Sequence, residues 1–186
     1  RHFDAEQAFL HGDLPVPIAV RFAEWETIEG QRYGLAYKSI YGFKQAAKIW
    51  YELSHDNIMR AEPRLQRCES DPCCYTYFDD NIKIILNTNV DDYFAACSDK
   101  SWFQTFWKNY NETGTTLVDE GDVERWFGVN FDWVHADGAS APPTAVKMSQ
   151  SADVLAMIGQ YGMADAKPSV TPLAAGFDTT PAGVEG

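Results

Sequence analysis

Residues 82–97 read Ile-Lys-Ile-Ile-Leu-Asn-Thr-Asn-Val-Asp-Asp-Tyr-Phe-Ala-Ala-Cys, a segment with two adjacent carboxylates between apolar runs. The runs Ile82–Leu86 and Tyr93–Cys97 are strand-like, and Asp91-Asp92 lies between them. Neighbouring residues of a strand point to opposite faces, so both acids aim the same way only where a turn reorients them. The segment therefore predicts a hairpin whose tight turn presents Asp91 and Asp92.

Strands and helices alternate on both sides of this hairpin. Cys74–Phe78 is a strand joined to Ile82–Leu86 by Asp79-Asp80-Asn81, which is a turn signal. The alternation predicts an α+β domain, an antiparallel sheet with helices packed on one face. The other expected strands are Ile18–Phe22, Tyr33–Lys38, Trp126–Val134 and Ala145–Ser149, and the expected helices are Phe43–Met59, 100–111 and 151–161.

A third candidate carboxylate is Asp4, which ends an opening segment and precedes Ala8-Phe9-Leu10. Unpaired carboxylates in a buried hairpin are costly, and a divalent cation offsets that cost. Three carboxylates from two strands can hold two Mg²⁺ ions about 4 Å apart, an arrangement that activates a 3′-hydroxyl and stabilises a leaving pyrophosphate. Because Asp-Asp pairs are also common in turns, as Asp79-Asp80 shows, spacing alone leaves the catalytic and turn interpretations both open.

The chain carries a formal net charge of −12, from 15 basic and 27 acidic residues among 186. A composition that is 45% hydrophobic favours one compact domain. The acidic charge is the wrong sign for a nucleic-acid binder, which normally has a basic surface. Only the segment 36–67 is basic, and its cations fit either a phosphate-facing surface or a solvated helix face. These cations are Lys38, Lys44, Lys48, Arg60, Arg64 and Arg67.

The four cysteines are too few and too unevenly spaced for a disulfide framework. Cys68 and Cys73-Cys74 have no nearby His, so free thiols fit better than zinc ligands and indicate an intracellular protein. No stretch reaches the roughly 18 apolar residues of a membrane span, and no signal-peptide core opens the chain. We therefore expect no membrane partner and no targeting signal.

Several motifs occur in an order that resembles a known family. Residues 4–14 read Asp-Ala-Glu-Gln-Ala-Phe-Leu-His-Gly-Asp-Leu, and residues 38–51 read Lys-Ser-Ile-Tyr-Gly-Phe-Lys-Gln-Ala-Ala-Lys-Ile-Trp-Tyr. Asn89-Val90-Asp91-Asp92 follows, and Lys-Pro-Ser-Val-Thr-Pro-Leu closes the series at 167–173. Together they resemble the reverse transcriptase of copia-type (Pseudoviridae-like) LTR retrotransposons, in the palm region of the Pol polyprotein. The motif at 38–51 is highly specific.

The resemblance implies a reverse-transcriptase palm over residues 1–173, with truncated fingers, a partial thumb or connection at the C-terminal end, and a disordered tail at 174–186. It implies an RNA-directed DNA polymerase that transfers a nucleotide from a dNTP to a primer 3′-hydroxyl with two Mg²⁺ ions, or alternatively Mn²⁺. Implied partners are an RNA or DNA template–primer, dNTPs and the rest of the Gag-Pol polyprotein, with its fingers, RNase H and integrase. The implied location is a cytoplasmic virus-like particle, with nuclear entry of the complex.

Positions that match the family's motifs carry its site roles by resemblance. Asp4, Asp91 and Asp92 would be the catalytic, metal-binding carboxylates. Phe9 falls where the family has an aromatic steric gate that excludes a ribose 2′-hydroxyl, and a core aromatic is the alternative. Ala5, through its carbonyl, would be an extra metal ligand. The other implied positions are Gln45 at the nucleotide and Lys44, Lys48, Trp126 and Gly128 at the nucleic acid. Trp126 and Gly128 lie in a turn that could equally be part of the core.

The chain departs from the family pattern at two of these motifs. Asn89 replaces the Tyr that precedes Val-Asp-Asp, and Ala47-Lys48 replaces Pro-Arg. The change from Arg to Lys loses a planar guanidinium that can bind a phosphate in bidentate fashion. With the fingers also missing, we expect little or no polymerase activity from the isolated fragment. Two rival interpretations stay open: a catalytically inactive transposon relic, and a non-enzymatic acidic module for protein interaction or metal binding.

Overall fold

The computed structural model describes residues 1–23, 25–28, 30–136 and 143–167. The chain divides into two compact units, Arg1–Trp126 and Phe127–Gly186. This division falls inside the range 1–173 that the sequence analysis assigns to one palm domain, and that assignment stays a prediction. The tail predicted at 174–186 lies outside the described residues.

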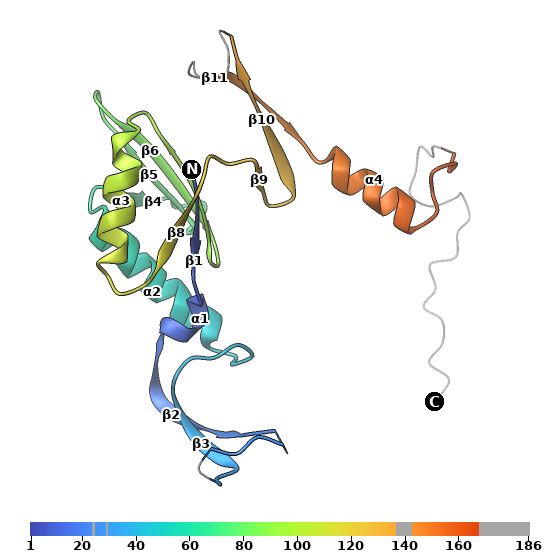
Figure 1. Ribbon diagram of the computed structural model, residues 1–186. Helices are drawn as coiled ribbons and strands as arrows, with labels where there is room; N and C mark the ends of the chain where they lie inside the picture. The colour runs from blue at the N-terminus through green and yellow to red at the C-terminus, as the bar shows by residue number, and fades with distance from the viewer. Residues whose placement is uncertain (24, 29, 137–142, 168–186) are drawn as a thin grey trace. The chain divides into compact units, whose positions relative to one another are not determined.

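A six-stranded antiparallel sheet is the framework of the first unit (Figure 1). Its strands are β1 (His2–Ala5), β4 (Gln66–Arg67), β5 (Cys74–Phe78), β6 (Lys83–Asn89), β7 (Asp92–Cys97) and β8 (Leu117–Gly121). The predicted hairpins are confirmed, because β5 pairs with β6 and β6 pairs with β7. Asp92, however, was predicted to lie in the turn with Asp91 and is instead the first residue of β7. The strand order β4-β5-β6-β7-β1-β8 inserts the first strand of the chain between β7 and β8.

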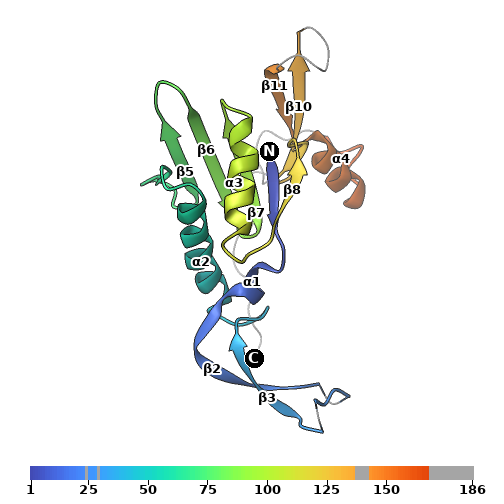
Figure 2. The same cartoon turned by 60° about the vertical axis from the view of Figure 1, so that its left-hand side comes forward.

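Two helices, α2 (Ala46–Ala61) and α3 (Ser101–Asn111), cover one face of this sheet (Figure 2), as predicted. The buried residues of α3, namely Trp102, Phe106 and Tyr110, recur at intervals of one helical turn and form its inner face. Between helices and sheet lies one hydrophobic core, which includes Phe3, Trp50, Ile58, Leu65, Tyr75, Ile84, Leu86 and Tyr93.

The ends of α2 differ from the prediction. The helix expected over Phe43–Met59 begins at Ala46 and ends at Ala61. Ahead of it, Gly42 has a φ of 94°, and the Ala46 amide donates to the Phe43 carbonyl over 3.1 Å in a turn. Apolar periodicity identifies the interior of a helix but carries little information about its ends, which explains the difference.

An antiparallel two-stranded ribbon, β2 (Asp13–Arg21) and β3 (Tyr33–Lys38), follows the short helix α1 (Ala8–His11). Both predicted strands are confirmed, although β2 begins five residues before Ile18. Between α1 and β2, a Cβ added at Gly12 would collide with the side chain of Ile49 on α2. Gly12 is therefore needed for the close approach of α2 to this connection.

The second unit contains the antiparallel hairpin β10 (Val129–His135) and β11 (Pro143–Ser149), followed by α4 (Ser151–Gln160). The predicted helix over 151–161 is confirmed, whereas residues 137–142 of the predicted loop lie outside the described residues. Within the described ranges, no helix combines the length and apolarity needed to cross a membrane.

The strand predicted over Trp126–Val134 is confirmed from Val129 onward, but its first three residues do not belong to it. Phe127 and Gly128 have φ values of 54° and 74°, which no strand accommodates. Trp126 therefore belongs to the two-residue strand β9 (Arg125–Trp126) at the end of the first unit, and the next strand begins at Val129. The alternation of apolar residues continues across the break, so the pattern alone could not reveal it.

Candidate active site

Asp4 and Asp92 lie directly opposite each other on the neighbouring strands β1 and β7. On β1, Phe3 and Ala5 are buried in the core, so His2 and Asp4 point to the face of the sheet opposite the helices. Residues opposite each other in an antiparallel pair share a face, which places Asp92 on this open face as well. The strand register therefore brings together two of the three predicted carboxylates.

The third carboxylate lies in the two-residue turn that connects β6 to β7. Asn89 and Asp92 form the last pair of these strands, so Val90 and Asp91 make the turn. Val90 has a φ of 56°, in the left-handed region that β-branched residues rarely adopt. The Asp91 carbonyl accepts a hydrogen bond from the Ala5 amide over 2.8 Å, which ties the turn to β1 beside Asp4.

Electrostatic repulsion acts among these acids. Burial raises the pKa of Asp4, the charges of Asp91 and Asp92 raise it further, and the neighbouring His2 lowers it. Nε2 of His2 lies 3.0 Å from Oδ1 of Asp92. A divalent cation placed among the three acids would relieve their repulsion.

The three carboxylates fit a hard divalent cation by their chemistry, because Mg²⁺ and Mn²⁺ prefer oxygen ligands. Among the residues that the structure describes, however, no three His, Cys, Asp or Glu side chains lie close enough together to hold a metal ion. Asp92 is engaged with His2 instead. Binding of a metal by Asp4, Asp91 and Asp92 therefore requires rotation of side chains whose backbones are already in place.

The cysteines are free thiols, as predicted. Cys68 and Cys74 lie on facing segments, because the Cys68 amide donates to the Cys74 carbonyl over 2.8 Å. Burial raises the pKa of the Cys74 thiol to about 11.

The positions assigned to the nucleotide lie on β1, α1 and the start of α2. Phe9 is half-buried on α1 and packs edge-on against the ring of Tyr41, with centroids 5.1 Å apart. Gln45 directly precedes α2, and its side chain makes no capping hydrogen bond. A pocket of about 230 Å³ lies between Phe9 and the turn that connects β6 to β7. It is lined by Phe9, Ala47, Trp50, Tyr51, Ser54, Cys73, Thr88, Asn89 and Val90.

Two lysines of the basic segment lie on the surface at the start of α2. Lys44 and Lys48 are both exposed, on either side of Gln45 and Ala46. Lys48 also forms an i,i+4 ion pair with Glu52, at 3.7 Å on the helix surface. An exposed pair of this kind is weak, so Lys48 can exchange it for another anion.

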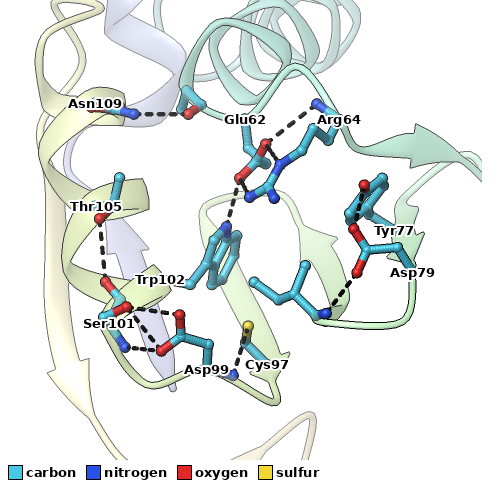
Figure 3. Close-up of polar contacts among 12 residues, drawn as sticks. Glu62, Arg64, Tyr77, Asp79, Cys97, Asp99, Ser101, Trp102, Thr105 and Asn109 are labelled. Carbon is cyan, nitrogen blue, oxygen red and sulfur yellow. Dashed lines mark hydrogen bonds and ion pairs between the residues drawn. The ribbon is translucent and has the colours of Figure 1, made fainter.

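Two arginines of the same segment contact side chains of their own chain. The guanidinium of Arg64 donates two hydrogen bonds to the carboxylate of Glu62, over 2.8 and 2.7 Å, and the Arg64 backbone amide donates another over 3.3 Å. The Trp102 indole donates a fourth over 2.8 Å (Figure 3). The guanidinium of Arg67 lies over the ring of Tyr51, 5.0 Å from its centroid. The phosphate-facing surface, one of the two interpretations of the six cations, therefore stays a prediction for Arg64 and Arg67, although both also contact side chains of their own chain.

Trp126 and Gly128, assigned by resemblance to the nucleic acid, belong to different units. Trp126 packs against Phe94 of β7, with ring centroids 5.3 Å apart. In the second unit, a Cβ added at Gly128 would lie 3.1 Å from the carboxylate of Asp153 on α4, and its φ is positive. Glycine is therefore favoured at 128 on two independent grounds.

The sequence analysis missed the buried groups behind the carboxylates. The Trp50 indole donates to the Val90 carbonyl over 2.6 Å, whereas the sequence predicted for Trp50 only a place in the helix over Phe43–Met59. A chain of buried hydroxyls runs from Ser54 of α2 through Tyr93 of β7 to Tyr110 of α3, with oxygens 2.7 and 2.8 Å apart. No local pattern could reveal these contacts, because each joins segments far apart in the sequence.

Comparisons with known proteins agree with the motif order. The model of a family described as reverse transcriptase (RNA-dependent DNA polymerase) matches residues 1–175. The retrovirus-related Pol polyprotein from transposon TNT 1-94 of Nicotiana tabacum is 30% identical over 174 residues. That alignment covers 92% of this chain but 12% of the relative, so the chain spans about an eighth of the relative's length. No solved structure matches the chain significantly.

Proposed function

Because the chain belongs to the reverse transcriptase (RNA-dependent DNA polymerase) family, we propose that it supplies the catalytic palm of an RNA-directed DNA polymerase of a copia-type retrotransposon. The reaction would transfer a nucleotide from a dNTP to the 3′-hydroxyl of a primer paired with an RNA or DNA template. The observation that carries the proposal is the register that sets Asp4 opposite Asp92, with Asp91 in the adjoining turn.

Asp4, Asp91 and Asp92 would hold two Mg²⁺ ions, or Mn²⁺, with the Ala5 carbonyl as a further ligand. When bound, the ions supply Lewis-acid stabilisation of the attacking 3′-oxygen and the leaving pyrophosphate. Burial and both neighbouring carboxylates raise the pKa of Asp4, and a nearby cation would favour its ionised form. Rotation of Asp92 away from His2 would complete the ligand set.

Phe9 and Gln45 would bind the incoming nucleotide. The edge-on contact with Tyr41 limits the movement of the Phe9 ring, so the ring can act as a rigid wall where a ribose 2′-hydroxyl would lie. Gln45 precedes α2 with its amide uncommitted to the helix cap, which leaves that amide available for a ligand.

Lys44, Lys48, Trp126 and Gly128 would contact the nucleic acid. The exposed ammonium groups of Lys44 and Lys48 suit phosphates, and they offset locally the acidic charge of the chain. The six-stranded sheet would be the palm, and the unit from Phe127 to about residue 173 the partial thumb or connection.

The proposed partners are a template–primer, dNTPs and the remaining parts of a Gag-Pol polyprotein, with its fingers, RNase H and integrase. The name of the tobacco relative supports a polyprotein setting, and this chain matches 12% of that relative. We propose a cytoplasmic virus-like particle as the location, with nuclear entry of the complex.

A second candidate function, a relic or acidic module without polymerase activity, is favoured by two observations. The Asp92 carboxylate is paired with His2 rather than free for a metal. The chain also carries a net charge of −12, which repels nucleic acid.

Primer extension on poly(rA)/oligo(dT) with Mg²⁺ separates the two candidates. The assay uses this chain alone and a chimera in which the chain replaces the 174-residue matching region of the tobacco relative. Extension by the chimera that disappears in Asp91→Asn, but persists in the surface control Asp80→Asn, supports the polymerase. A folded chimera that extends no primer, beside a tobacco parent that does, excludes it and leaves the relic or acidic module.

A further inference from the structure

The turn between β6 and β7 has an unusual backbone for its sequence. Two-residue hairpin turns place glycine, asparagine or aspartate where φ is positive. Here Val90 occupies such a position, with a φ of 56°. A β-branched side chain crowds its own backbone in this region, so the conformation persists only where other contacts hold it.

Contacts from two other elements hold both carbonyls of this turn. The Ala5 amide of β1 donates to the Asp91 carbonyl over 2.8 Å, and the Trp50 indole of α2 donates to the Val90 carbonyl over 2.6 Å. Trp50 is only 2% exposed, so water cannot readily replace the Val90 carbonyl as its partner. The side chain of Val90 is itself 49% exposed, so packing contributes less to holding it.

We propose that Trp50 is a positioning residue whose indole N–H holds the strained Val90 turn and thereby keeps Asp91 and Asp92 beside Asp4. This inference rests on the proposed function of those carboxylates as metal ligands. The bond acts on backbone rather than on a carboxylate, so its loss lets the turn relax towards a negative φ at Val90. Asp91 then swings away from the other two acids.

Three variants of the chimera separate positioning from packing. Trp50→Phe keeps a large ring but removes the indole donor. Val90→Gly removes the backbone strain, so the double variant Trp50→Phe/Val90→Gly no longer needs the hydrogen bond to the Val90 carbonyl. Trp107→Phe is the matched control, because the Trp107 indole also donates to a backbone carbonyl, that of Leu117, over 2.7 Å.

The main readout is the affinity for Mn²⁺, measured by electron paramagnetic resonance without nucleotide or primer. We expect Trp50→Phe to weaken Mn²⁺ binding about 10-fold, the usual size of an effect exerted through a ligand's support. The double variant should recover to within about 3-fold of the parent, and Trp107→Phe should remain at the parental value. Circular dichroism and thermal unfolding confirm that each variant is folded.

Three results would overturn the inference: parental Mn²⁺ affinity in folded Trp50→Phe, an equal loss in Trp107→Phe, or no recovery in the double variant. If Trp50→Phe does not fold, a benzothienylalanine at position 50 deletes the donor within an almost unchanged ring. If the parent binds no Mn²⁺, the proposed metal site fails, and nuclear magnetic resonance of the Val90 and Asp91 amides decides the inference by itself. Shifts at those amides in Trp50→Phe that Val90→Gly reverses support positioning, and unchanged shifts refute it.

Discussion

The ring of His2 and the carboxylate of Asp92 lie 3.0 Å apart on the open face of the sheet, beside Asp4. A cation that binds Oδ1 of Asp92 must therefore compete with His2. The same contact gives Asp92 a partner in the metal-free protein, which lowers the cost of placing a second acid opposite Asp4.

Mg²⁺ should stabilise the folded chain. We expect Mg²⁺ at ten times its dissociation constant to raise the free energy of unfolding by about 1.4 kcal/mol, because it binds only the folded chain. Asp4→Asn should abolish that increase, and His2→Ala should enlarge it by freeing Asp92. Thermal unfolding with and without Mg²⁺ measures these effects, and Asp80→Asn is the surface control. An Mg²⁺ effect that survives Asp4→Asn would place the ion elsewhere.

Phe9 should control the choice between deoxyribonucleotides and ribonucleotides. Phe9→Val shortens the side chain and opens the space beside Tyr41, so we expect ribonucleotide incorporation by the active chimera to rise by about tenfold or more. Single-nucleotide extension with dTTP and UTP measures the ratio. The matched control is Phe103→Val, a half-buried phenylalanine on α3. Equal ratios in both variants would assign Phe9 to the core.

Glu62 should make stability depend on pH. Hydrogen bonds from Arg64, and then from Trp102, lower the pKa of Glu62 below its ordinary value of 4.5, although burial opposes the shift. Because folding lowers this pKa, the stabilisation is complete well above pH 4.5 and is lost as pH falls through the folded value. Glu62→Gln should lower the free energy of unfolding by about 1–3 kcal/mol at pH 7.

Urea unfolding between pH 7 and pH 3 tests this linkage. The difference between the wild-type protein and Glu62→Gln should shrink as the pH falls below about 4.5, because the wild-type carboxylate becomes protonated. The control is Glu52→Gln, whose ion pair with Lys48 is exposed and should matter little at any pH. A difference that stays constant with pH would show that the charge of Glu62 is not involved.

Gly12 should tolerate no side chain. Its φ of −74° is accessible to any residue, so the constraint is the close approach of Ile49 rather than the backbone conformation. We expect Gly12→Ala to lower the free energy of unfolding by about 1–3 kcal/mol through overpacking. Ile49→Val keeps the colliding methyl group, whereas Ile49→Ala removes it and should rescue the glycine variant. Chemical denaturation of the wild-type protein, Gly12→Ala, Ile49→Ala and the Gly12→Ala/Ile49→Ala double variant measures the coupling between the two positions. Simple additivity of the two single effects would contradict it.

Local patterns in the sequence predicted much of the fold. The runs on either side of Asp91-Asp92 predicted the β6–β7 hairpin, and the helix expected over 100–111 corresponds to α3. These features depend on neighbouring residues, whose alternation or helical period shows which side is buried. The motif order also identified the family that the comparisons show.

Only the tertiary structure decided which distant groups meet. The insertion of β1 between β7 and β8 sets Asp4 opposite Asp92, and this register depends on the burial of Phe3 and Ala5 against helices elsewhere in the chain. The bond from Trp50 to the Val90 carbonyl likewise joins α2 to a turn formed forty residues later. The sequence by itself determined the family and many of the strands and helices, because these depend on local sequence pattern. Register and backbone contacts between elements required the fold, because they depend on how all the elements bury their apolar faces together.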